Sequence, residues 1–142
     1  MTEQTRQHTN EQREIRIGKL DQIRALGYEP FGQAFNWDHS STQVIENADA
    51  LEQSGEHVRL AGRLMIIRDH GKTAFATLRD ARGDIQLYFR QDTLTDREWQ
   101  LFHLLDRGDI IGVDGIVFRT HTGEITVRVE SYTILTKALR PL

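Results

Sequence analysis

The chain has 142 residues, of which 38% are hydrophobic and 27% are charged, as is typical of a soluble globular protein with a buried core. It contains no cysteine, which excludes disulfides and thiolate zinc sites. No apolar run approaches the roughly 20 residues that span a bilayer, and the polar N-terminus is unlike a signal peptide. We therefore expect a cytoplasmic protein without a membrane partner.

The net charge of −3 is distributed unevenly along the chain. Residues 57–90 carry 7 basic and 3 acidic side chains, whereas residues 1–56 and 91–142 are both net acidic. A protein that binds nucleic acid through a globally basic surface is therefore not expected. The basic side chains of residues 57–90 are consistent with a local patch that binds an anionic partner, and the alternative is that they form an ordinary solvated face.

Residues 11–56 predict a helical N-terminal extension, preceded by polar residues 1–10, which we expect to be disordered. A helix is expected from Glu11, because apolar side chains recur at every third position, and Gly27 suits a left-handed helix end. The apolar positions are Ile17, Leu20, Ile23 and Leu26.

A connector with the sequence FGQAFNWDHSS follows, and we expect its aromatic side chains to pack onto the rest of the chain. Ser41 or Thr42 is expected to cap a short second helix over residues 44–51. The sequence therefore predicts one or two N-terminal helices before the strands begin.

From residue 57 the apolar pattern changes to strict alternation, which predicts β-strands. The side chains expected to face the core are Val58, Leu60, Gly62, Leu64 and Ile66 in the first strand, Ala74, Ala76 and Leu78 in the second, Ile85, Leu87 and Phe89 in the third, and Ile125, Val127 and Val129 in the fifth. After the third strand, Thr95 and Glu98 form a capping box for a helix that is expected to end at Gly108.

Five strands with one helix between the third and fourth predict a five-stranded OB-fold Greek-key barrel over residues 57–136. The fold class is thus all-β with a helical extension. An SH3-like barrel has strands of similar length and is the competing prediction. The position of the helix favours the OB fold.

The same alternation places two unexpected side chains, Phe75 and Gln86, on the outer face of the barrel. The DARG turn makes their strands antiparallel about a centre between residues 80 and 81, so Phe75 is expected opposite or diagonal to Gln86. The DHGK turn folds Arg68 back toward the start of the second strand.

These three side chains suit an unpaired nucleobase. An exposed phenyl ring is a stacking platform, a glutamine amide can bond a base edge, and an arginine can stack or bind a phosphate. OB folds bind oligonucleotides on this face. The alternative is that the N-terminal helix covers Phe75 and that the other side chains only solvate the barrel.

Four ordered segments carry a family resemblance: KLDQIRALGYEPF, VRLAGRLMIIRDHGKTAFATLRDARGDIQLYFRQD, LFHLLDRGDIIGVDGIVFRTHTGEITVRV and YTILTKALRPL. They resemble the N-terminal anticodon-binding domain of bacterial lysyl-tRNA synthetases, which are class II enzymes of the aspartate–asparagine–lysine subgroup. The likeness covers nearly the whole chain after about Glu14. It implies an OB fold that binds the U-rich anticodon loop of lysine tRNA.

In that family the middle anticodon base, a uracil, stacks on a phenylalanine and is bonded by a glutamine and an arginine. The matching positions here are Phe75, Gln86 and Arg68, and Glu124 is similar to a further anticodon contact. Candidates for contacts with the RNA backbone are Arg63, Lys72, Arg79, Tyr88 and Arg90. One departure is His70, which stands where the family has a short apolar residue and leaves the loop geometry open.

The resembling synthetases continue after ALRPL into a catalytic domain that binds ATP, magnesium and lysine. Residues 137–142 are expected to begin the linker to it. The sequence has no glycine-rich phosphate loop, metal-ligand cluster or nucleophile–base set, so we expect no cofactor in this chain and no aminoacylation by it alone.

The resemblance implies a homodimeric parent enzyme, of which this chain is an excised domain or a truncated form. Two alternatives stay open at this point. One is a free-standing OB protein that binds single-stranded nucleic acid without codon specificity, and the other is a protein-interaction module.

Overall fold

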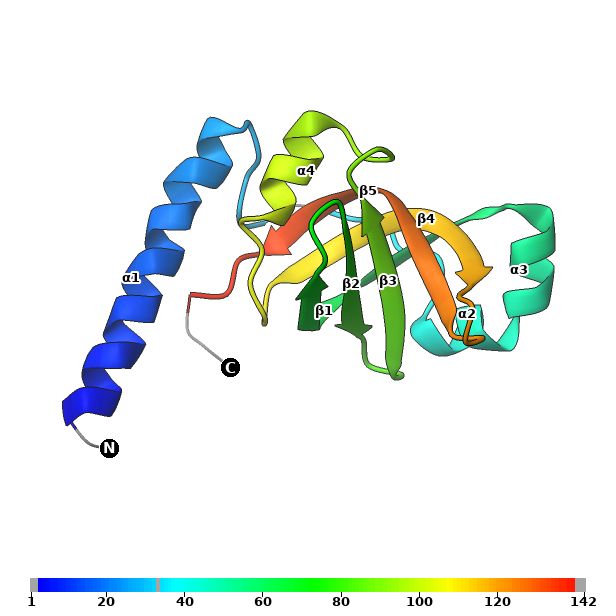
Figure 1. Cartoon of the computed structure of the whole chain (residues 1–142), viewed down its shortest axis with the longest axis horizontal. Coiled ribbons are helices and arrows are strands. Elements are labelled where there is room, and N and C mark those ends of the chain that lie inside the picture. Colours follow the sequence, from blue (N-terminus) through cyan, green and yellow to red (C-terminus); the bar gives the residue numbers. More distant parts are fainter. Residues whose placement is uncertain (1–2, 33, 140–142) are drawn as a thin grey trace.

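The computed structural model of the chain describes residues 3–32 and 34–139. Its elements in chain order are α1 (Glu3–Ala25), α2 (Ser41–Glu46), α3 (Ala48–Ser54), β1 (His57–Asp69), β2 (Thr73–Arg79), β3 (Asp84–Arg90), α4 (Asp96–Phe102), β4 (Ile110–Arg119) and β5 (Ile125–Thr136). Figure 1 shows the strands as one barrel, with α1 and α4 at one end and α2 and α3 at the other.

The strands close into a barrel in the order β1-β2-β3-β5-β4. All neighbouring pairs are antiparallel except β3 and β5, which run parallel through the pairing of Gln86 to Tyr88 with Thr126 to Arg128. This order, with α4 between β3 and β4, confirms the predicted OB-fold Greek-key barrel.

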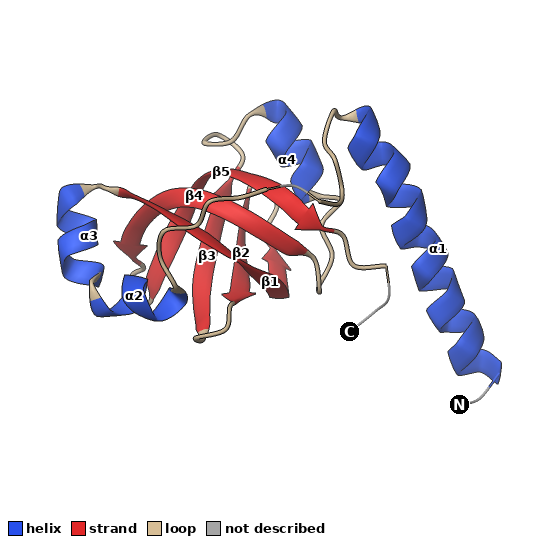
Figure 2. Cartoon of the chain, turned by 180° about the vertical axis from the view of Figure 1, so that it is seen from behind, coloured by secondary structure: helices blue, strands red, loops and turns tan. Residues whose placement is uncertain are grey.

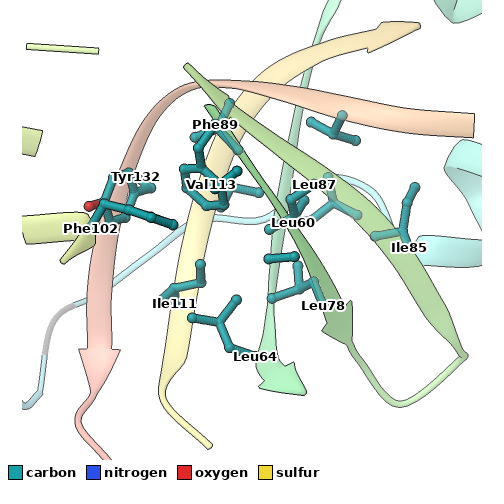
Figure 3. Close-up of a cluster of buried hydrophobic side chains, with 14 of the residues drawn as sticks. Leu60, Leu64, Leu78, Ile85, Leu87, Phe89, Phe102, Ile111, Val113 and Tyr132 are labelled. Atoms are coloured by element: carbon teal, nitrogen blue, oxygen red, sulfur yellow. The ribbon is translucent and has the colours of Figure 1, made fainter. Parts of the chain in front are cut away.

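Alternate side chains of every strand fill the barrel, as the period-two pattern predicts. Figure 3 shows part of this core, with strand side chains clustered together with Phe102 of α4; the strand residues labelled there are Leu60, Leu64, Leu78, Ile85, Leu87, Phe89, Ile111, Val113 and Tyr132. The helix α4 closes one end, because the ring of Phe102 lies 4.9 Å from that of Phe89. The predicted capping box of Thr95 and Glu98 is present at its start. The helix ends at Phe102, before the expected stop at Gly108.

One expected core residue lies outside. The pairing of β1 with β2 shifts between Leu64 and Ile66, which is a β-bulge at Met65. The extra residue turns Ile66 to the outer face, where it is 43% exposed, and Ile67 packs against the core in its place. The prediction of an inward Ile66 was wrong because strict alternation cannot register a bulge.

The N-terminal helix starts earlier than expected. It begins at Glu3, so much of the segment predicted to be disordered is helical; residues 1–2 lie outside the described part of the chain. Glu, Gln and Arg are good helix formers, which the disorder prediction underrated. Only Ile23 of the predicted stripe is fully buried, and Ile17 is 39% exposed. Gly27 adopts φ of +91°, as expected of a left-handed helix end.

The second predicted helix is divided in two. Ser40, not Ser41 or Thr42, caps α2 through a capping box with Gln43, and Asn47 separates α2 from α3. Figure 2 shows the connector between α1 and α2 crossing the outside of the barrel. As expected, an aromatic of this connector packs back: a Cβ at Gly112 would lie 2.5 Å from the ring of Phe35.

None of the helices in the described ranges is both long and apolar enough to cross a membrane.

Candidate nucleic-acid interface

The outer face of β1, β2 and β3 carries the candidate residues in two adjacent rows. In the first row Arg68 pairs with Phe75, and Phe75 pairs with Tyr88. In the second row Ile66 pairs with Thr77, and Thr77 pairs with Gln86. The pairing centre lies one residue further along than expected, so Phe75 is diagonal to Gln86 and faces Tyr88 directly.

The bulge in β1 determines the position of Arg68. Before the bulge, even-numbered residues such as Leu60 and Leu64 face the core, and an unbroken strand would turn Arg68 inward as well. The extra residue at Met65 reverses the parity, so Arg68 is exposed beside Phe75. The three residues that the sequence singled out thus lie on one face.

Three aromatic side chains form what we call the aromatic ladder: Phe75, Tyr88 and Phe118. The rings of Phe75 and Tyr88 lie 4.8 Å apart at 30°, and those of Tyr88 and Phe118 lie 5.7 Å apart at 56°. Each is half-buried, so each leaves ring surface to solvent. The sequence interpretation missed Phe118, although the buried Val117 next to it places Phe118 outward by alternation.

The loop between β1 and β2 frames one end of the ladder. The ring of His70 stands edge-on to Phe75 at 6.4 Å, and its backbone N–H donates to the carbonyl of Thr73. Gly71 takes φ of +90° and donates to Asp69 Oδ1. His70 therefore occupies an ordinary tight turn and extends the ladder by an edge contact.

The amide of Gln86 is held from below by β5. Its Nε2 donates to Thr126 Oγ1 at 3.1 Å, and that hydroxyl donates to the carbonyl of Glu124 at 3.1 Å. Thr126 is fully buried, so this link is shielded from water. The Gln86 carbonyl oxygen has no hydrogen bond to any described residue and is free to accept one from a ligand.

Glu124 follows the turn between β4 and β5. Its backbone N–H donates to Thr120 Oγ1, and its carbonyl accepts from both Thr120 N and Thr126. The side chain is exposed. Glu124 is therefore connected to Gln86 through one hydroxyl, which brings the fourth anticodon candidate next to the other three.

The basic candidates divide into paired and unpaired groups. Arg79 donates two hydrogen bonds to Asp84, at 2.8 and 3.0 Å, and this contact lowers the pKa of Asp84. Arg90 pairs with Asp92 at 2.7 Å. By contrast, the exposed side chains of Arg63, Arg68 and Lys72 have no ion pair within residues 3–32 and 34–139.

Among the side chains that the structure describes, no group of three or more His, Cys, Asp or Glu residues could hold a metal ion. The aromatic rings, the Gln86 amide and the exposed cations of this face offer stacking, hydrogen bonding and charge.

Residues 58–135 match the tRNA anti-codon family, which is described as an OB-fold nucleic acid binding domain. The chain is 51% identical over 128 residues to a lysine–tRNA ligase of Moorella thermoacetica, an alignment that covers 90% of this chain and 26% of that protein. It is 45% identical over 136 residues to the lysine–tRNA ligase of Carboxydothermus hydrogenoformans, covering 96% of this chain and 28% of that protein.

A third relative, the lysine–tRNA ligase of Bacillus subtilis, is 41% identical over 145 residues, covering 99% of this chain and 29% of that protein. The chain thus spans between 26% and 29% of the length of these curated relatives. The match to the family extends over the whole barrel, including the face described above. The chain belongs to the tRNA anti-codon family of OB-fold nucleic acid binding domains.

Proposed function

We propose that this chain is the anticodon-recognition module of a lysine–tRNA ligase and that it binds the U-rich anticodon loop of lysine tRNA. Membership of the tRNA anti-codon family and the similarity to lysine–tRNA ligases support the choice of ligand. The observation that carries the proposal is the partly exposed aromatic ladder on the outer face of β2, β3 and β4, flanked by Arg68 and Gln86.

Stacking on Phe75 supplies the main affinity for one unpaired base. Its ring is backed by Tyr88 at 4.8 Å, so it is already oriented before RNA arrives. Base–aromatic stacking contributes about 1–3 kcal/mol per base and tolerates any base. Phe75 therefore provides binding without much selectivity.

Gln86 and Arg68 provide selectivity for uracil. The Watson–Crick edge of uracil has one N–H donor between two carbonyl acceptors, and proteins read unstacked RNA bases by bonding such edges. The free carbonyl oxygen of Gln86 accepts from the N–H, and the unpaired guanidinium of Arg68 donates to a carbonyl. Cytosine has no N–H at that position, so it loses the first of these bonds.

Glu124 serves a neighbouring base. Its exposed carboxylate is an acceptor with negative charge, which suits a base N–H and disfavours a phosphate. Lys72, and Arg90 after release from Asp92, supply charge for the RNA backbone at the other side of the ladder.

The relatives are named as ligases, and the present chain spans about a quarter of their length. We propose that attachment of lysine to tRNA, with ATP and magnesium, takes place in a part of the parent enzyme outside this chain. This chain then positions the tRNA for it. The homodimeric state of the parent and the cytoplasmic location stay predictions.

The decisive variant is Phe75→Ala. We expect it to weaken binding of an RNA hairpin with a UUU loop by about 1–3 kcal/mol while the chain stays folded, because the ring lies on the outer face of the barrel and is only partly buried. Phe31→Ala, which removes another half-buried ring in the connector, is the matched control and should leave the affinity unchanged.

A fluorescence anisotropy titration of both variants measures the effect. Unchanged binding by Phe75→Ala would contradict the proposal. Equal affinity of the unaltered chain for the UUU hairpin and for an unrelated single strand would indicate the free-standing, sequence-tolerant binder instead. Absence of any RNA-dependent NMR shift at Phe75 or Gln86 would favour the protein-interaction module.

A further inference from the structure

A cavity of about 460 Å³ lies outside the barrel, next to the aromatic ladder, and shares Arg63 and Arg79 with the interface candidates. Its walls come from the connector before α2, from β1 and from the turn between β2 and β3. We call it the Trp37 pocket, and the residues that matter for the argument are Trp37, Ala61, Arg63, Asp80, Arg82 and Ile110. The segment that contributes Trp37 is the connector that crosses the barrel in Figure 2.

Trp37 is held in place through its backbone neighbours. The N–H groups of Asp38 and His39 both donate to the carbonyl of Arg59 in β1, at 2.9 and 3.1 Å. The Asp38 carboxylate in turn accepts from Arg59 N at 2.8 Å. The indole itself is 61% exposed and makes no hydrogen bond or ring contact with the described side chains. A large aromatic is thus fixed at its backbone and left open at its face.

The charged groups of the pocket that a ligand can reach are positive. Arg63 and Arg82 are exposed, and neither has an ion pair in the described part of the chain. The one carboxylate in the wall, Asp80, already accepts from Ser41 N, Ser41 Oγ, Arg82 N and Gly83 N. The small side chain of Ala61 and the apolar Ile110 complete the lining. An apolar wall, an open indole and two free guanidiniums suit a planar, anionic ligand.

The pocket continues the path of the interface. Arg63 pairs with Arg79, and Arg79 follows Phe75 on the same outer face of β2, with Thr77 between them. Four residues of strand place Arg79 about 13 Å from Phe75. A strand of RNA that leaves Phe75 along β2 reaches the pocket at that distance. OB folds contact 4–16 nucleotides, more than the three of an anticodon.

We propose that the Trp37 pocket binds a nucleotide of the same RNA strand that flanks the anticodon, with its base against the indole and its phosphate between Arg63 and Arg82. This inference rests on the proposed function. It assigns a second stacking site, which binds RNA independently of the anticodon sequence. The pocket adds affinity and sets the direction of the strand, while the ladder reads the sequence.

The test uses the full chain and a UUU hairpin RNA with unpaired nucleotides on both sides of the anticodon. Trp37→Ala is expected to weaken hairpin binding about tenfold, and Trp37→Phe to restore most of it. Arg63→Gln and Arg82→Gln should each weaken binding and lower the slope of log affinity against log salt by about 1. Arg119→Gln, which removes a surface arginine that is ion-paired with Asp49, is the charge control and should change neither.

A second readout follows the indole directly. The chain has two tryptophans, and Trp99 is buried against Phe102, so RNA that stacks on Trp37 should quench the exposed part of the emission. If Phe75→Ala weakens binding but Trp37→Ala does not, and the emission is unchanged, the pocket inference is overturned and the proposed function stands. If the unaltered chain does not bind the hairpin, both are overturned.

Discussion

One buried hydroxyl holds the side chain to which we assign selectivity for uracil, Gln86. Thr126 has no contact with solvent, yet its hydroxyl accepts a hydrogen bond from the Gln86 amide and donates one to the carbonyl of Glu124. A glutamine on a barrel surface otherwise rotates among several rotamers, and fixing one of them costs free energy on binding. The hydrogen bond to Thr126 fixes the rotamer when the barrel folds, so Gln86 is already oriented for the base contact that we propose.

Thr126→Val tests this arrangement at the residue scale. The change keeps the shape and removes the hydroxyl, so Gln86 loses its anchor while the Glu124 carbonyl keeps its bond from Thr120 N. We expect RNA affinity to fall by about 1 kcal/mol and the preference for uracil over cytosine to narrow, measured by titration with both hairpins. Thr133→Val, the same change on β5 opposite Gly112, should alter neither. An unchanged preference in Thr126→Val would show that Gln86 needs no anchor.

The sequence predicted which side chains face outward wherever the alternation within a single strand determines it. Alternation alone placed Phe75 and Gln86 outward, because each strand carries its own apolar pattern. It could not show Thr126 beneath Gln86, since that contact comes from the parallel pairing of β3 with β5, 40 residues apart. It also could not show the bulge that exposes Arg68, which the sequence placed near the second strand only through the DHGK turn.

At the scale of elements, a single carboxylate joins α2 to the turn between β2 and β3. Asp80 accepts hydrogen bonds from the backbone and hydroxyl of Ser41, the first residue of α2, and from two N–H groups of its own turn. Burial raises the pKa of Asp80, but these four hydrogen bonds outweigh it and leave the pKa below its ordinary value. The sequence predicted both elements but gave no sign of this bond between them, because it spans 39 positions.

Asp80→Asn is expected to lower the free energy of unfolding by about 1–2 kcal/mol at neutral pH. Since the folded pKa is lower than the unfolded value of about 3.9, the carboxylate stabilises the fold above that value and loses its effect as pH falls through the folded pKa. The difference between the two proteins should therefore be constant above about pH 5 and shrink below about pH 4.

Urea unfolding at a series of pH values measures this dependence. Asp21→Asn, an exposed carboxylate on α1, is the matched control and should stay within about 0.5 kcal/mol of the unaltered chain at every pH. A stability difference for Asp80→Asn that persists unchanged down to the lowest pH would show that packing, and not the carboxylate's hydrogen bonds, is responsible.

At the scale of the whole molecule, a charged cluster fastens the helical extension and the end of the last strand to the barrel. Lys137 donates to Asp106 at 2.6 Å and to both oxygens of the fully buried Asp109, and Lys19 of α1 also bonds Asp106. Lys137, at which the linker is expected to begin, follows β5 directly and has a buried side chain. Residues 140–142 of that expected linker lie outside the described part of the chain.

The cluster also explains why α1 leaves the interface open. Two hydrogen bonds from α1 go to Asp106 and Arg107, before β4, and α1 stands beside the α4 end of the barrel in both overall views, away from β2. From the sequence, one alternative was that the N-terminal helix covers Phe75. A helical pattern specifies which face of the helix is buried, but it does not specify the surface against which that face packs. The receiving surface is set by long-range contacts, here the burial of Ile23 and the bond from Lys19 to Asp106, which have no local signature.

Lys137→Met is the strongest test of this cluster. Methionine has a similar length but no charge, so the carboxylate of Asp109 stays buried without its counter-ion, which typically costs 3–5 kcal/mol. We expect the free energy of unfolding, measured in urea, to fall by about that amount. Lys19→Met removes the partly exposed partner of the same cluster and should cost about 0–1 kcal/mol. Adding Asp109→Asn to Lys137→Met should recover part of the loss, because it removes the stranded charge. Equal effects of the two lysine variants would mean that the buried pair contributes no more than a surface contact.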